Sequence, residues 1–166
     1  MAAYTIVPGA SEISIGAKST VHAIKGSAVD VDGSLDAELD GGGLVRSLAG
    51  RIDLPVAALR SGNPLEDAEL QRRMDARRYP RICGEVRKAV PLGDDGLFRV
   101  EGDVTFHGVT RAVEDTLLVR CEGDGLILEG EHVFDIRDFG VKPPRILMLR
   151  VDPMVKVRIR LVAELA

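Results

Sequence analysis

The clearest pattern in the chain is an alternation of apolar and polar residues over 126–140, LILEGEHVFDIRDFG. Leu128, His132, Phe134 and Ile136 share one parity, and mostly charged residues fill the other. A period of two is typical of a β-strand with one buried and one solvated face. The last glycine of this stretch can adopt turn dihedrals that other residues avoid, so we expect the strand to end there.

The same alternation recurs along most of the chain, interrupted by short turns rich in glycine and aspartate. Such turns are too short for a crossover, so they favour antiparallel hairpins. We expect Lys25-Gly26-Ser27 to form the first of these turns, and we expect a short turn of helix over 44–48. The predicted strands are 12–24, 29–39, 51–59, 82–90, 97–107, 112–121, 126–140 and 154–164.

One segment changes to a helical period. Asn63 is a good N-cap residue, Pro64 suits the first helical position, and carboxylates occupy the first turn, where the helix dipole favours them. Pro80 closes the segment. We therefore predict one helix over about 64–78.

Eight antiparallel strands with alternating faces can close into a barrel whose interior holds side chains or one small ligand. A two-sheet sandwich is the other way to close them, and the alternation alone fits both. The chain of 166 residues is long enough for one well-buried core, so we expect a single domain over 1–166. The fold class is all-β in either case.

Composition narrows the range of possible binding partners. The net charge of -4 argues against nucleic acid, because phosphate binding needs a cationic surface. Two cysteines without a repeated spacing make neither a zinc site nor a disulfide framework. The start lacks a basic leader, and no long apolar run follows. We therefore predict a cytoplasmic protein with no membrane span, no metal and no cofactor.

Three histidines are the main candidates for chemistry. His22, His107 and His132 lie on separate predicted strands or turns without metal-binding spacing, which favours separate structural roles over a metal site. His132 has the inward parity, where it would either bond a polar neighbour or contact a ligand. No G-x-S-x-G segment occurs, and neither cysteine neighbours a histidine. The sequence thus favours a protein without catalytic activity.

Five arginines crowd the segment 72–81, opposed by one aspartate. Such a cluster could hold an anionic head group, for which Arg73 and Arg77 are the candidates, or touch a membrane surface transiently. An ordinary solvated helix face explains the same charges equally well. Both interpretations stay open at this stage.

Several short motifs, in the right order, resemble the YceI-like family of lipocalin-type barrels. The segment 100–111, VEGDVTFHGVTR, is similar to the family's G-x-L-T-hydrophobic-x-G-V-T-K/R motif, and 134–140 is similar to F-x-I-R-x-F-G. Tyr79-Pro80-x-Ile82 and Val31-x-Gly33-x-Leu35 also match. Gly84 stands where the family usually has an aromatic residue, so we expect either a wider cavity there or a neighbour such as Phe98 or Phe106 filling the space.

The resemblance implies an eight-stranded antiparallel lipocalin-like barrel with one helical insertion, and it implies binding of an isoprenoid or another long-chain lipid inside. Two alternatives stay open: an enzyme acting on such a ligand through His132, and a filled barrel that binds partners or serves in a stress response. Both a monomer and a homodimer fit the sequence. The expected ligand-binding residues are Ile13, Ile15, Gly84, Phe98, Val100, Val104, Phe106, Leu117, Val119, His132, Phe134, Ile136, Val155, Val157 and Ile159.

Overall fold

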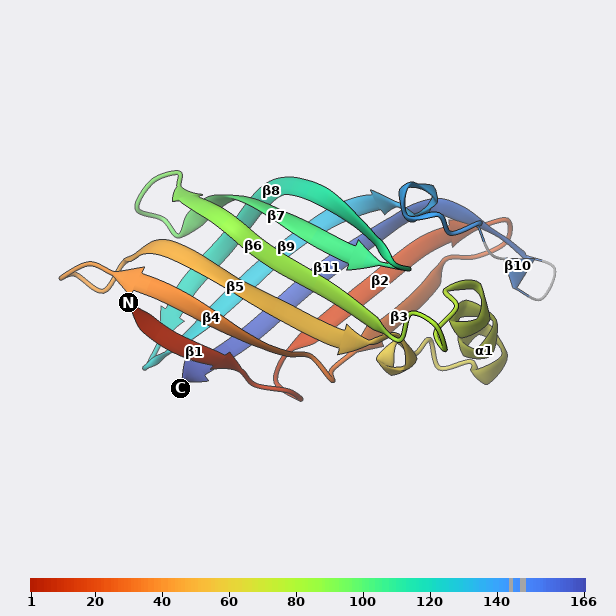
Figure 1. The fold of residues 1–166 in the computed structure, drawn as a ribbon, viewed down its shortest axis with the longest axis horizontal. Coiled ribbons are helices and arrows are strands. Elements are labelled where there is room, and N and C mark those ends of the chain that lie inside the picture. The colour runs from red at the N-terminus through yellow and green to blue at the C-terminus, as the bar shows by residue number, and fades with distance from the viewer. Residues whose placement is uncertain (144, 147–148) are drawn as a thin grey trace.

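Eight antiparallel strands form a closed ring in the computed structural model, which describes residues 1–143, 145–146 and 149–166 (Figure 1). β1 pairs with both β4 and β11, and this double pairing closes the ring. The predicted eight-stranded antiparallel barrel is confirmed. The ring strands are β1 (Ala2–Ile6), β4 (Asp32–Leu39), β5 (Val45–Pro55), β6 (Arg81–Pro91), β7 (Leu97–Phe106), β8 (Val109–Glu122), β9 (Gly125–Asp135) and β11 (Leu149–Leu165).

β11 is long enough to serve two partners along one edge. Its last residues pair with β1, and its earlier part pairs with β2 (Glu12–Ser19), which in turn pairs with β3 (Ile24–Ala28). Where the partner changes, the backbone N–H of Val162 donates to the Ser11 hydroxyl at 2.9 Å. Ser11 is fully buried, so this bond satisfies a backbone group that neither neighbouring strand reaches.

The N-terminal third differs from the sequence-based prediction. The predicted strand 12–24 ends at Ser19, and the hairpin turn lies at 20–23, whereas Lys25-Gly26-Ser27 lies inside β3. β1 was not predicted at all. Residues 45–48 belong to β5 and not to a helix, because Val45 and Leu48 face the core and pair with β4.

The predicted helical insertion is confirmed as α1 (Pro64–Arg73), and it is shorter than expected. The Asn63 side chain accepts from the N–H groups of Leu65 and Glu66, which makes the predicted N-cap. Asp75 has a φ of 50°, a conformation that cannot continue an α-helix. The helix therefore ends before 78, and a short helical turn, η1 (Val56–Ala58), precedes it.

The strand predicted over 126–140 ends at Asp135. The Asp135 carboxylate accepts from the Arg137 backbone N–H and starts the 3₁₀ turn η2 (Ile136–Phe139). Gly140 then adopts a φ of 73°, which is the role expected of that glycine. A two-residue strand, β10 (Arg145–Ile146), pairs with the start of β11.

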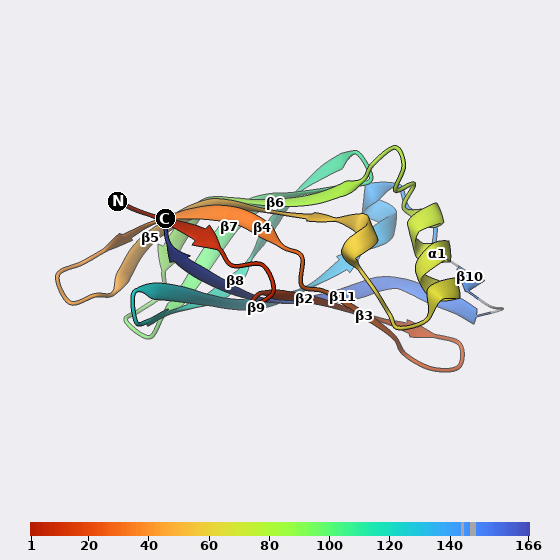
Figure 2. The same ribbon diagram turned by 90° about the horizontal axis from the view of Figure 1, so that it is seen from below.

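The barrel has two distinct ends (Figures 1 and 2). We call the end with both termini and the β4–β5, β6–β7 and β8–β9 turns the packed end, because its inward side chains are buried. The other end, with α1, η2 and the β2–β3 turn, is the open end. Side chains buried at the packed end are Tyr4, Ile6, Leu35, Ala37, Phe98, Val119, Leu126, Leu128, Leu161 and Ala163.

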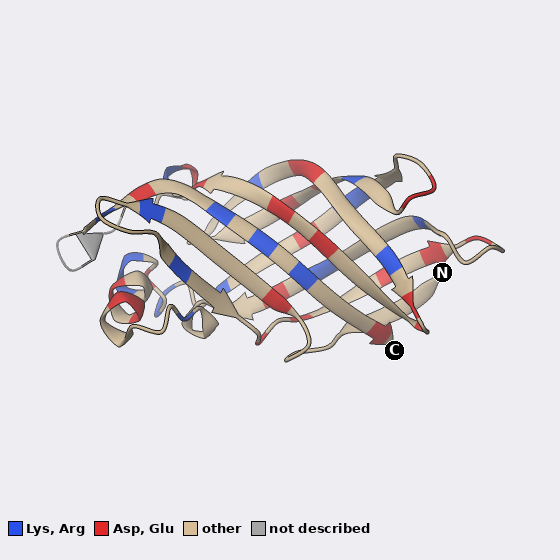
Figure 3. Cartoon of the chain, turned by 180° about the vertical axis from the view of Figure 1, so that it is seen from behind, with Lys and Arg blue, Asp and Glu red and all other residues tan. Residues whose placement is uncertain are grey.

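Charged residues recur along the strands (Figure 3), and most of them have the exposed parity. Lys156 and Arg158 of β11 both reach Glu131 of β9, and Arg120 of β8 reaches Glu129. Exposed pairs of this kind add little stability, but they keep the outer face solvated while the opposite parity faces inward.

Candidate ligand-binding site

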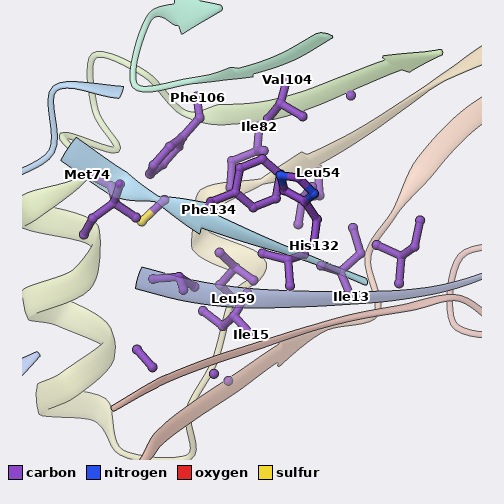
Figure 4. A pocket seen from close by; sticks show the side chains of 18 of the residues that line it. Ile13, Ile15, Leu54, Leu59, Met74, Ile82, Val104, Phe106, His132 and Phe134 are labelled. Atoms are coloured by element: carbon purple, nitrogen blue, oxygen red, sulfur yellow. The ribbon is translucent and has the colours of Figure 1, made fainter. Parts of the chain in front are cut away.

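A cavity of about 330 Å³ occupies the open end of the barrel. Its wall is almost entirely apolar and is built from the inward parity of strands on all sides, with α1 at the mouth (Figure 4). Along β11, Leu161 and Ala163 are buried at the packed end, whereas Val155, Val157 and Ile159 are only half-buried, because they face the cavity. The volume falls at the lower end of the range for small-molecule sites.

Most of the predicted ligand-binding residues lie together on this wall. Ile13 and Ile15 come from β2, Val100, Val104 and Phe106 from β7, and His132 and Phe134 from β9, and they share the wall with Gly84, Leu117, Ile136, Val155, Val157 and Ile159. Phe98 and Val119 do not border the cavity. They have the correct inward parity, but they stand at the packed end, where neighbouring side chains enclose them. Contact with a ligand stays a prediction for the residues on the wall.

Gly84 has one close side-chain neighbour. A Cβ at this position would lie 3.3 Å from Cγ1 of Ile52, on the neighbouring strand β5. The side chain that leans toward the glycine is therefore Ile52, and not Phe98 or Phe106 as expected. Both residues line the cavity, so the missing side chain adds to the open space.

The wall contains one polar pair. Asp115 of β8 and His132 of β9 both line the cavity, and the Asp115 Oδ2 atom lies 2.5 Å from the His132 Nδ1 atom. The Phe134 ring packs edge-on against the imidazole with 4.5 Å between centroids. His132 thus bonds a neighbouring polar group through Nδ1, which agrees with one of the two sequence-based interpretations, and its contact with a ligand stays a prediction.

The two head-group candidates are placed differently. Arg73 lines the cavity at its mouth, and its Nε atom donates to Glu69 Oε1 at 3.0 Å. Arg77 is exposed in the turns after α1 and does not border the cavity. Arg73 also lines a second cleft, together with Arg72, Gly140 and Lys142, and we call this the basic cleft.

Three of the sequence motifs meet at one corner of the open end. The His107 Nδ1 atom lies 3.0 Å from the carbonyl oxygen of Phe139, and the Tyr79 ring stands edge-on to His107. Gly108 has a φ of 73°, and a Cβ there would lie 2.5 Å from the Tyr79 ring. These motifs therefore hold the β7–β8 turn, η2 and the segment after α1 together around the mouth.

The YceI-like domain family matches residues 4–163. The chain belongs to the YceI-like family. The BcnA protein of Burkholderia cenocepacia is 18% identical, with a TM-score of 0.79 over 95% of this chain and 98% of that one. A polyisoprenoid binding domain from Saccharophagus degradans, implicated in plant cell wall breakdown, is 14% identical, with a TM-score of 0.77 over the full length of both chains. No curated protein matches the chain.

A second YceI protein extends the likeness of fold. The Campylobacter jejuni YCEI protein is 18% identical, with a TM-score of 0.56 over 71% of each chain. At such identities the likeness establishes the barrel fold alone.

Sequence reasoning missed several residues of the YceI-like site. Ile52 and Leu54 were assigned to a strand but not to the wall, and Leu70 and Met74 of the helical segment close the mouth. Asp115 could have been identified from the sequence, because it shares parity with Leu117 and Val119 on an otherwise apolar face. A carboxylate on such a face needs a partner, and His132 supplies it.

Cys83 borders the cavity, and burial raises the pKa of its thiol, which disfavours the nucleophilic thiolate. Among residues 1–143, 145–146 and 149–166, no three His, Cys, Asp or Glu side chains gather as a metal site would require. Within the same ranges no helix has the length and apolar character to cross a bilayer.

Proposed function

We propose that this YceI-like barrel binds a long-chain apolar ligand, an isoprenoid or acyl lipid, in the open-end cavity without transforming it. The observation that carries this proposal is an apolar cavity wall that no other side chain among the described residues covers. Val104, Phe134 and Val157 have the inward parity of a core residue, yet they are only half-buried and face the cavity. Interiors are normally filled, so an apolar wall left open is suited to an apolar chain.

The driving force would be burial of the ligand's hydrocarbon. Each buried methylene contributes about 0.8 kcal/mol, so about a dozen would supply on the order of 10 kcal/mol. Association costs roughly 4–15 kcal/mol, so short chains would bind weakly and longer ones well. Affinity should therefore rise with chain length until the chain reaches the filled packed end.

The relatives support an isoprenoid as the first candidate. The Saccharophagus degradans domain, which shares the fold over its full length, is described as a polyisoprenoid binding domain. The basic cleft and Arg73 stand at the mouth, where a lipid with an anionic head group would place that group. Arg77, which was also predicted to contact the head group, would require movement of the turns after α1 to do so.

The proposal can be tested without knowing the ligand. Organic extraction of the purified protein followed by mass spectrometry should recover a lipid in stoichiometric amount. In delipidated protein, a series of prenyl alcohols of increasing length should raise the melting temperature progressively, because a ligand that binds only the folded state stabilises it. The added alcohol should be recovered with its mass unchanged. No extractable lipid and no shift with any chain length would contradict the proposal.

A further inference from the structure

The Asp115–His132 pair stands where the β8–β9 ladder has ended. The two strands pair from Glu122 and Gly125 up to Leu118 and Glu129, and the described register does not continue beyond that point. Past it, the side chains of Asp115 and His132 connect the two strands on the cavity side. Within the residues that the structure describes, this is the only polar contact between inward side chains along this part of the wall. It also links β8 to β9 where their backbones no longer pair.

The geometry orients the imidazole. An ionised carboxylate only accepts hydrogen bonds, so the Nδ1 atom that lies 2.5 Å from Asp115 Oδ2 carries the hydrogen, an assignment that follows from the hydrogen-bond network. In a neutral ring the other nitrogen, Nε2, then has a free lone pair. Within the described part of the chain His132 makes its hydrogen bond through Nδ1, and its side chain keeps 33% of its surface exposed, so Nε2 is accessible from the cavity. The ring projects from β9 beside Phe134 into the cavity (Figure 4).

An acceptor that faces an apolar cavity favours a ligand that brings a donor. We propose that the cavity selects long-chain apolar ligands that carry a hydroxyl group, an alcohol or a phenol, whose O–H donates to Nε2 of His132. Asp115 acts as a positioning residue, because it fixes the tautomer and the orientation of the ring. This inference rests on the proposed function, and it adds the chemical class of the ligand. A protonated imidazole would instead donate from Nε2 and would accept an ether or ketone as readily as an alcohol, so loss of the alcohol preference or its reversal would overturn it.

Affinities of three matched ligands test the selection: a prenyl alcohol, its methyl ether and the ketone of the same chain. The wild-type protein should bind the alcohol about five- to tenfold more tightly than the ether, which is the net value of one hydrogen bond. His132→Phe keeps the ring and removes both nitrogens, so it should abolish this preference. Phe106→Leu is the control, because it shortens an apolar side chain of the same wall and should weaken all three ligands alike.

The outcomes separate the two levels of the proposal. Binding of the three ligands with equal affinity, or an alcohol preference that survives in His132→Phe, would overturn the hydroxyl inference and leave the proposed function standing. If none of the three binds, the proposed function fails and this inference fails with it.

The role of Asp115 has its own readout. The ¹⁵N chemical shifts of the imidazole distinguish the two neutral tautomers, and His132→Phe identifies the His132 signals among those of the three histidines. The wild-type protein should show the tautomer with hydrogen on Nδ1. Asp115→Asn should give a mixture of the two tautomers and should reduce the alcohol preference, because a ring with hydrogen on Nε2 donates to an ether oxygen as well as to a hydroxyl oxygen. A wild-type ring with its hydrogen on Nε2 would overturn the inference.

Discussion

Phe98 and Phe106 lie on the same strand and on the inner side of the barrel, but they experience different surroundings. Phe98 has 1% of its surface exposed and stands in the packed end, within a continuous apolar core. Phe106 is half-buried at the open end, where it contacts Phe139 and faces the cavity. One β-strand thus passes from a filled core into the cavity wall within eight residues, without any change in its alternation.

Under the proposed function, stability and ligand binding are divided along the barrel axis. The packed end buries its side chains against each other, so it can hold the ring closed without a ligand. At the open end the apolar wall faces an unfilled cavity. Its side chains therefore lack the dispersion contacts that a packed interior would give them. We infer that mutations at the packed end mainly change folding and that mutations at the open end mainly change ligand uptake.

The largest expected effect compares the two phenylalanines directly. Phe98→Ala should lower the free energy of unfolding by about 3–5 kcal/mol, because it leaves a void in a filled core. Phe106→Ala should cost less than about 2 kcal/mol, because its space merges with an existing cavity and the main loss is its contact with Phe139. Urea unfolding of the two variants measures both values.

Ligand binding should show the opposite order in the same variants. Phe106→Ala should reduce the affinity for a prenyl alcohol, and folded Phe98→Ala should retain it. Equal losses of stability, or equal losses of affinity, would remove the distinction between the two ends.

Filling the cavity is the second test. Gly84→Phe should change the free energy of unfolding by less than about 1 kcal/mol, because the new Cβ meets only the flexible side chain of Ile52 and the ring can enter the cavity. Ligand affinity should fall at least about tenfold, which corresponds to roughly 1.4 kcal/mol of lost contact.

Ala37→Phe provides the matched control at the packed end. Ala37 has no exposed surface, so the same ring has no room there, and overpacking should destabilise the protein by about 1–3 kcal/mol or more. A Gly84→Phe variant as unstable as Ala37→Phe would show that the cavity wall near Ile52 is as tightly packed as the core.

The third prediction concerns the mouth. Arg73→Ala should weaken a lipid with an anionic head group several-fold and leave its neutral analogue nearly unchanged, because charge-assisted bonds to Arg73 would be lost. Arg77→Ala should change neither affinity, because Arg77 does not border the cavity. Isothermal titration with both ligands measures the difference. Equal losses for the anionic and the neutral ligand would show that Arg73 contacts the chain rather than the head group.

Much of the ring could be predicted from the sequence because alternation of polarity specifies both a strand and its inner face. The residues of β7, β9 and β11 that were expected to face inward do so, and Asn63 caps the helix as predicted. β1 was missed because five residues with little alternation become a strand only through their long-range pairing with β4 and β11. Residues 45–48 are a strand for the same reason.

The extent of the cavity could not be predicted from the sequence. Parity gives the face of the barrel but not the position along its axis, so Phe98 and Val119 were grouped with residues that line the open space. Whether an inward residue is buried in the core or lines the cavity depends on which strands reach each end of the barrel and on how α1 covers the mouth. The partner of His132 was missed because Asp115 is distant in sequence, although its polar character on an apolar face was visible.

The smallest expected effect compares two partly exposed carboxylates, one at each end. Hydrogen bonds from the Leu44 backbone N–H and from Arg46 lower the pKa of Asp40 in the β4–β5 turn, and bonds from Arg72 and Arg73 lower the pKa of Glu69. A carboxyl group whose folded pKa lies below its unfolded value, about 4, stabilises the fold above that pH, and this stability is lost as the pH falls through the folded pKa. Asp40→Asn and Glu69→Gln should each flatten the decline in stability slightly between about pH 5 and pH 2, as measured by urea unfolding at several pH values.

Only Glu69→Gln should also strengthen binding of an anionic lipid at neutral pH, because it releases Arg73 at the mouth. An equal change in lipid affinity in Asp40→Asn would show that the packed end also influences the site.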